Sequence, residues 1–219
     1  MLNASTSGNH LLRVQVYNYL EKQMRLGNLE PGSSISVNTM IKELGVSRTP
    51  LREALLLLQE QGFVTIRPQR GVKINALTID DVKDIYEILG GIESRIILSV
   101  FDNLRGKEIQ QMKALNDEIE LALANCDIVS HNRANINFHG VFLGLSKNER
   151  MRRYVKNLKM QLYDFPRRDF GKKWNDNNLH QHRQFVQLIE EGKALAAADY
   201  LRDIHWDFDL PDSFQIISG

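Results

Sequence analysis

Hydrophobic residues recur at helical spacing through the first third of the chain. Over residues 10–26 an apolar side chain stands at every fourth position, which predicts an amphipathic helix. Two more helices are predicted over 36–45 and 47–62, because each stretch starts with a serine that can cap a helix and ends with a glycine that can stop one. Pro50 falls in the first turn of the later helix, where its missing N–H costs little.

Two short strands follow these helices. Residues 63–67 and 71–75 have the pattern of strands on either side of a turn. Two helices joined by a tight turn and followed by a hairpin make a winged helix-turn-helix, whose third helix can enter the major groove of DNA. The sequence therefore predicts a winged helix-turn-helix DNA-binding domain over residues 1–76.

After residue 76 the strand signal disappears and helical periodicity continues. Thr78, followed by Asp80 and Asp81, has the pattern of a helix start with acidic residues against the helix dipole. We predict an all-α bundle of about six helices over residues 77–219, so that the fold is mainly α. Breaks between the helices are expected near Gly106, Asp127, Ser146, 166–175 and Gly192, and a weak point at Gly90-Gly91.

Composition excludes several classes of protein and divides the chain into two parts. The 42% hydrophobic and 25% charged content is ordinary for a globular protein, and the single cysteine excludes an internal disulfide. No apolar run reaches the ~18 residues of a membrane span, so we expect a cytoplasmic protein without a membrane partner. Residues 1–76 carry nine Lys and Arg against five Glu, whereas the rest is slightly acidic. A polyanionic partner is therefore expected for the first part.

The predicted third helix begins with side chains suited to DNA. Arg48 and Arg52 lie four residues apart and share one helix face, from which each can bridge a guanine edge or clamp a phosphate. The alternative is a helical hairpin whose arginines are only solvated charges. If DNA binds, the hydroxyls nearby and the hairpin tip are expected to contact it as well; these residues are Ser47, Thr49, Arg67, Arg70 and Gly71.

These residues carry a resemblance to a known family. Residues 45–55 read GVSRTPLREAL, and the matching stretch extends from Leu29 to Val72. The chain resembles the GntR family of bacterial transcription regulators in this region. The resemblance implies that Arg48 and Arg52 contact operator DNA and that the wing reaches the minor groove. Asn38 stands where the family often has a basic DNA-contacting residue, so the salt dependence of binding is expected to differ.

The second part contains residues that could hold a metal ion. Asn135 and His139 are one helical turn apart, and His182 and His205 fall on two later helices. Three imidazoles and one amide oxygen could converge on a borderline divalent ion such as Zn²⁺ or Ni²⁺. The alternative, which spacing alone favours, is that these histidines are surface or hydrogen-bonded core residues.

The letters around these residues resemble a second family. The segments NINFH, QHR and RDIH, which end at or contain the three histidines, are similar to the metal motifs of FCD effector-binding domains, and the resemblance covers about residues 80–208. Asn135 replaces the acid that the family has. Leu89 stands where the family often has an arginine that holds a carboxylate effector. We therefore expect the effector to be less acidic than usual or to be bound differently.

The resemblances imply a ligand-responsive transcription regulator and not an enzyme. We expect a homodimer that binds a palindromic double-stranded operator, acts as a repressor, and senses a small organic-acid-type metabolite near the divalent metal ion. Two alternatives stay open. The first is a metal-free regulator whose histidines contact the effector directly. The second is a three-histidine metalloenzyme fused to a DNA-binding module, which is disfavoured because no general base is evident beside the histidines.

Overall fold

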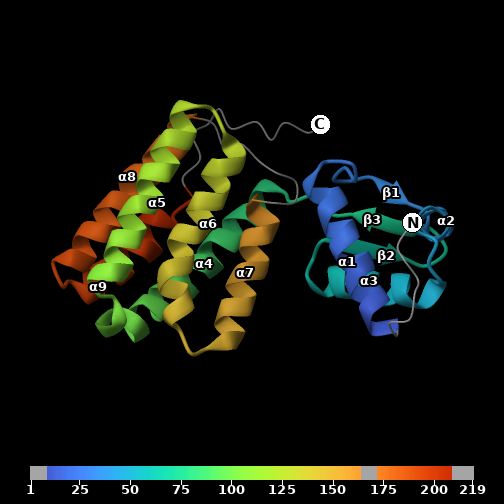
Figure 1. Ribbon diagram of the computed structural model, residues 1–219, viewed down its shortest axis with the longest axis horizontal. Coiled ribbons are helices and arrows are strands. Elements are labelled where there is room, and N and C mark those ends of the chain that lie inside the picture. Colours follow the sequence, from blue (N-terminus) through green and yellow to red (C-terminus); the bar gives the residue numbers. More distant parts are fainter. Residues whose placement is uncertain (1–8, 164–171, 209–219) are drawn as a thin grey trace. The chain divides into compact units, whose positions relative to one another are not determined.

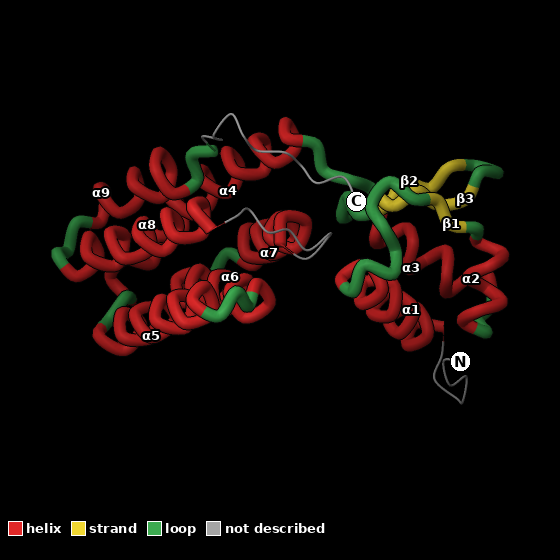
Figure 2. The backbone as a smooth tube through the Cα atoms, turned by 90° about the horizontal axis from the view of Figure 1, so that it is seen from above, coloured by secondary structure: helices red, strands yellow, loops and turns green. Residues whose placement is uncertain are grey.

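The computed structural model describes residues 9–163 and 172–208. The chain divides into two compact units: among the described residues, the first consists of those up to Leu77 together with 160–163, and the second consists of 78–159 and 172–208. The mainly α fold with an N-terminal winged helix-turn-helix, expected from the sequence, is confirmed (Figures 1 and 2). No helix in the described part of the chain is long and apolar enough to cross a membrane.

The first unit is built from three helices and a three-stranded antiparallel sheet of order β1-β3-β2. The predicted hairpin is present, and in addition β1 pairs with β3 through Ser34 opposite Lys73. This two-residue strand was missed because it is too short to show an alternating pattern. The elements are α1 (Asn9–Arg25), β1 (Ser34–Ile35), α2 (Val37–Leu44), α3 (Arg48–Glu60), β2 (Val64–Arg67) and β3 (Gly71–Ile74).

The capping residues at the helix ends and the apolar stripe of α1 explain how this unit folds. Ser36 caps α2 by accepting a hydrogen bond from the Thr39 N–H, and Gly45 ends that helix in the left-handed conformation. Ser47 does stand at the start of α3, but its side chain makes no capping hydrogen bond. The predicted stripe of α1 packs against α3 and forms the core; its buried members are Val16, Leu20 and Met24, opposite Leu51, Leu55 and Leu58.

The second unit contains six α-helices among the described residues, as the periodicity predicted. Thr78 forms a reciprocal capping box with Asp81 at its start. Pro166 lies outside the described residues. The helices are α4 (Ile79–Val100), α5 (Gly106–Ala124), α6 (Ile128–Leu145), α7 (Glu149–Tyr163), α8 (Lys172–Glu190) and α9 (Ala194–Tyr200), with a 3₁₀ turn η1 (Phe101–Asn103) and a π-helical turn η2 (Leu201–His205).

The α4 helix runs without a break through Gly90-Gly91, where a weak point was expected. The reason is packing: a Cβ on Gly90 would lie 3.1 Å from the Trp206 Cβ and 3.2 Å from the Arg202 carbonyl oxygen. The glycine therefore lets η2 approach α4 closely. In η2 the Trp206 N–H donates to the carbonyl of Leu201, five residues back, which is the π-helical pattern and was not foreseen.

The wing, which consists of β2, β3 and the turn between them, requires a glycine at position 71. This residue has φ +89°, and a Cβ there would lie 2.5 Å from the Ile35 carbonyl oxygen in β1. We expect Gly71→Ala to destabilise the first unit by about 1–3 kcal/mol through backbone strain, and by more through the clash with β1. Hydrogen exchange of the wing amides under increasing urea measures the loss.

Gly45→Ala is the matched control. Gly45 also has a positive φ of +65°, but nothing lies within 4 Å of the Cβ position. We expect it to show the strain alone, about 1–2 kcal/mol. Equal losses in the two variants would contradict the close approach of β1 to the wing.

Candidate functional site

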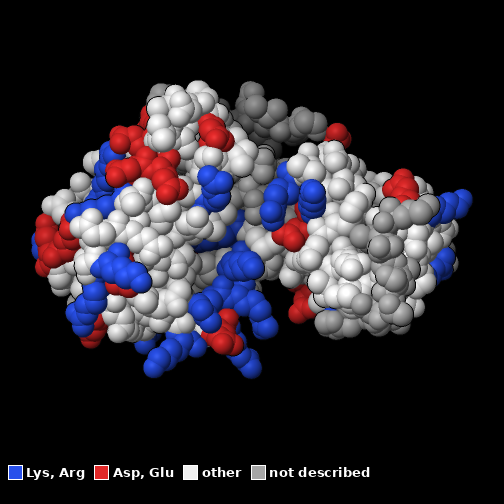
Figure 3. All heavy atoms as spheres, viewed as in Figure 1, with Lys and Arg blue, Asp and Glu red and all other residues white. Residues whose placement is uncertain are grey.

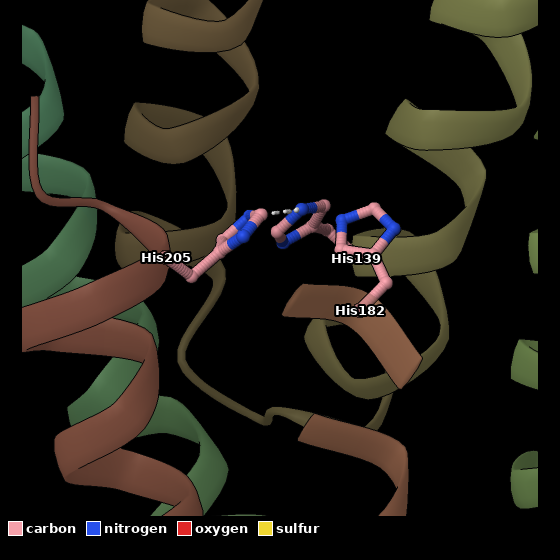
Figure 4. Close-up of side chains that lie close together, drawn as sticks. All are labelled: His139, His182 and His205. Carbon is pink, nitrogen blue, oxygen red and sulfur yellow. Dashed lines mark hydrogen bonds between the residues drawn. The ribbon is translucent and has the colours of Figure 1, made fainter. Parts of the chain in front are cut away.

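Three buried histidines meet inside the second unit. His139 comes from α6, His182 from α8 and His205 from η2, and their candidate ligand atoms all lie within 4.8 Å of one another (Figure 4). Their exposed fractions are 0%, 2% and 5%. The structure thus brings together, from three separate elements, the three histidines that the sequence grouped.

Their surroundings keep these imidazoles neutral. Burial lowers the pKa of His139, His182 and His205 well below the ordinary value of 6.5. The positive charge of Lys159 and, for His182 and His205, the neighbouring histidines lower the pKa further. A neutral imidazole is the form that binds a metal ion, because it offers an unprotonated ring nitrogen.

Hydrogen bonds assign the tautomers of two of the rings. His139 Nδ1 lies 2.7 Å from Glu93 Oε2, and a carboxylate can only accept, so His139 carries its proton on Nδ1. The Gln181 amide nitrogen donates to the Ile204 carbonyl at 3.2 Å, which leaves its oxygen to accept from His205 Nδ1 at 3.1 Å. Both rings therefore present an unprotonated Nε2.

These two unprotonated nitrogens face each other at 3.2 Å. Two lone pairs at that distance repel unless a cation or a proton stands between them. In a tetrahedral zinc site with Zn–N bonds of ~2.0–2.1 Å, two ligand nitrogens lie about 3.3 Å apart. The spacing and the tautomers both fit a shared metal ion.

His182 supplies a further sign of a missing ligand. Its ring stacks on Phe138 at a centroid distance of 3.8 Å, and neither of its buried ring nitrogens has a hydrogen-bond partner. An unsatisfied buried polar group is costly, so such a nitrogen needs a bound atom that the protein itself does not provide. A metal ion held jointly with His139 and His205 satisfies one of the two nitrogens.

Glu93 is the residue of this site that sequence reasoning missed. Its fully buried carboxylate accepts hydrogen bonds from His139 Nδ1 and, at 3.0 Å, from Trp206 Nε1, and it pairs with Lys159 Nζ at 2.7 Å. A carboxylate behind a metal-binding histidine fixes the ring and raises its basicity. The signal was present: Glu93 stands on the apolar face of α4, between the buried Leu89 and Ile97.

The fourth sequence-predicted ligand, Asn135, is buried on α6 one turn before His139. It is therefore only one helical turn from a histidine of the site, but whether its amide oxygen binds a metal ion together with the histidines stays a prediction. Trp206 also belongs to the site, because its Nε1 donates to Glu93, and its ring packs edge-on against Tyr86.

The residues expected to contact DNA lie at the surface of the first unit. Ser47, Arg48, Thr49 and Arg52 are exposed around the first turn of α3, and Arg67 and Arg70 are exposed on either side of the wing turn. Asn38 Oδ1 accepts a hydrogen bond from Arg48 Nη2 at 3.0 Å. Asn38 therefore helps to orient an arginine that points into solvent. Gly71 has a structural reason in its close approach to β1, and its contact with DNA stays a prediction.

A second basic surface lies on α7 of the other unit, where Lys and Arg gather in the view of Figure 3. The exposed residues Lys147, Arg150, Arg153 and Lys156 recur at every third position. Lys147 precedes the helix, and the other three residues lie on its solvated face.

Comparison with known proteins gives two matching families. Residues 12–74 match the model of bacterial regulatory proteins of the gntR family, and residues 84–205 match the FCD domain. The HTH-type transcriptional regulator YdhC of Bacillus subtilis (strain 168) is 29% identical over 197 residues, which cover 86% of this chain and 85% of the relative. The HTH-type transcriptional repressor RspR of Escherichia coli (strain K12) is 24% identical over 145 residues, covering 66% and 64%.

Among solved structures, E. coli McbR/YncC matches with a TM-score of 0.65 over 87% of this chain and 93% of that chain. Its sequence identity is 19%, so this likeness concerns the fold alone.

The buried histidines make the stability of the metal-free protein depend on pH. Their folded pKa values lie well below 6.5, so below that pH the unfolded chain binds protons that the folded chain does not. We expect the melting temperature to be flat above about pH 7 and to fall steadily toward about pH 5. Each histidine contributes ~1.4 kcal/mol per pH unit to the slope.

Tryptophan fluorescence of the second unit follows this transition. His182→Asn is expected to make the pH dependence shallower by one proton, whereas the exposed His180→Asn leaves it unchanged. A melting temperature that does not change between about pH 7 and about pH 5 would contradict the neutral, buried state of the three rings.

Proposed function

Since the chain belongs to the GntR family of bacterial regulatory proteins and carries an FCD domain, we propose that it is a metal-containing, effector-controlled repressor. It is a DNA-binding transcription regulator and not an enzyme. Our proposal assigns residues 1–76 to operator binding and residues 77–219 to effector sensing, with Zn²⁺ or Ni²⁺ held by His139, His182 and His205. A regulator acts at the chromosome, so we propose a cytoplasmic location.

The observation that carries the metal assignment is the pair of unprotonated Nε2 atoms 3.2 Å apart, with the partnerless ring of His182 beside them. Imidazole nitrogen suits borderline ions such as Zn²⁺ and Ni²⁺ better than hard ions such as Mg²⁺. When bound, the ion supplies a positive centre to which an acidic effector can coordinate. Asn135 is the protein's own candidate for an oxygen ligand.

The DNA side of the proposal rests on the exposed first turn of α3. Arg48 and Arg52 project from this turn, which in a helix-turn-helix enters the major groove. A homodimer places two such helices one helical turn of DNA apart and therefore selects a palindromic operator. An effector that binds the DNA-incompetent arrangement more tightly by ~1–3 kcal/mol releases the operator. The similarity to the repressor RspR favours this direction of control.

A metal-free regulator is the second candidate, and one observation favours it. Asn135 brings no negative charge to a site whose three imidazoles are neutral, so nothing of the protein's own in direct reach neutralises a divalent ion. In that case the effector itself would occupy the point between the histidines. The metal content of the protein separates the two candidates.

Metal analysis of protein purified without a nickel column tests the first candidate. We expect one zinc or nickel ion per chain. Loss of a residue that only hydrogen-bonds a metal ligand typically weakens metal binding by about 10- to 100-fold. His182→Asn removes a ligand itself, so it should weaken zinc binding by more than this, as measured by chelator competition. His180→Asn, an exposed position on the same helix, should have no effect. Unchanged zinc affinity in His182→Asn would refute the three-histidine site.

Operator binding tests the DNA side. We expect Arg48→Ala and Arg52→Ala each to weaken binding to a DNA fragment selected by the wild-type protein by about tenfold or more, because a bidentate base contact is worth ~1–3 kcal/mol. Lys83→Ala, an exposed change on α4, is the control. Fluorescence anisotropy at several salt concentrations measures the binding. Full retention in the double arginine variant would overturn the proposed recognition surface.

A further inference from the structure

The α4 helix carries no cation at the position where an effector-binding arginine was expected. Leu89 stands there and is completely buried. Arg95, the arginine of this helix, is exposed. A side-chain cation that binds a carboxylate effector beside the metal ion must therefore come from another element.

Lys159 of α7 is such a group. It is 3% exposed, and no other lysine or arginine whose side chain the structure describes is buried. Its Nζ lies 2.7 Å from Glu93 Oε1 and 5.1 Å from the centre of the Trp206 ring. Burial lowers the pKa of its ammonium to about 8, and Glu93 opposes that shift. Lys159 is thus a charged side chain held beside the histidine site.

The Lys159 ammonium has more hydrogen-bond donors than Glu93 alone can accept from. It carries three N–H donors, and Glu93 is the acceptor that the structure places against it. The face of the Trp206 ring attracts the charge but takes up no strong hydrogen bond. Donors therefore remain for an acidic group that enters the site. Glu93 connects this ammonium to the histidine site, because its other oxygen accepts a hydrogen bond from His139 Nδ1 at 2.7 Å.

The balance of charge favours an anionic ligand. The charges of Glu93 and Lys159 cancel, Asn135 carries no charge, and an imidazole binds a metal ion in its neutral form, so the protein contributes no net charge to the site. A divalent ion would leave two positive charges buried without compensation, which is costly. A carboxylate on the effector removes this cost.

We propose that Lys159 is the effector-binding cation of this protein, and that it binds the acid group of a small organic carboxylate. This inference rests on the metal-containing site of the proposed function. Lys159 performs, from α7, the task for which an arginine on α4 was expected. The effector is accordingly acidic but is bound differently, which is one of the two outcomes that the sequence left open.

Calorimetric titration of the zinc-loaded full chain with succinate and with citrate tests the proposal. We expect saturable binding of at least one of these acids to the wild type, and a loss of about tenfold or more in Lys159→Met. Lys159→Arg, which keeps the charge, should retain most of the affinity. Lys156→Met makes the same chemical change at an exposed position of α7 and should bind like the wild type.

A second comparison guards against damage to the fold, because Lys159→Met leaves Glu93 buried without its partner. The double variant Glu93→Gln/Lys159→Met removes both charges and keeps an acceptor for His139. Compared with Glu93→Gln alone, it should bind the same acid about tenfold or more weakly.

Three results would overturn the inference: equal affinity in Lys159→Met and wild type, no binding of either acid by the zinc-loaded wild type at about 10 mM, or a loss of zinc affinity in Lys159→Met that accounts for the loss of acid binding. A wild type that binds no zinc would instead refute the proposed function, so the two failures are distinguishable.

Discussion

The buried carboxylate of Glu93 organises the second unit. Its two oxygens contact three other elements: His139 on α6, Lys159 on α7, and Trp206 directly after η2. A buried charge is tolerated only when it is paired and hydrogen-bonded, and removing one partner of such a pair typically costs about 3–5 kcal/mol. The same contacts that make this carboxylate tolerable also turn the His139 ring so that its Nε2 faces the other histidines.

The two units use charge in opposite ways. In the first, arginines stand exposed on a helix start and a wing, where they cost little and can meet phosphates and base edges. In the second, one lysine and one glutamate are buried together with three neutral imidazoles. Such a site responds strongly to an added charge because little water screens it. That difference suits one unit to contact a polymer and the other to detect a small ligand.

Local signals in the sequence were sufficient for most of the fold but not for all of the site. Caps such as Ser36 and Thr78, and stripes of period 3.6, predicted the helices because they depend on residues within one or two turns. The role of Glu93 depends on partners 46 to 113 residues away in the chain, which no local pattern records. The π-helical turn at η2 and the unbroken path of α4 through Gly90 depend likewise on the close packing of these two elements. The histidines were identified from the letters around them, through a resemblance, and not from their spacing alone.

Hydrogen bonds from outside the ligand set fix which nitrogen of His139 and of His205 is available to a metal ion. Long-range ¹H–¹⁵N correlation spectra of the zinc-loaded protein observe this directly, since they distinguish Nδ1 from Nε2 in each imidazole. The account predicts a proton on Nδ1 of His139 and of His205, slow to exchange with solvent, and a metal-bound Nε2 in both. An Nε2-protonated His139, or a ring that alternates between the two forms, would contradict it.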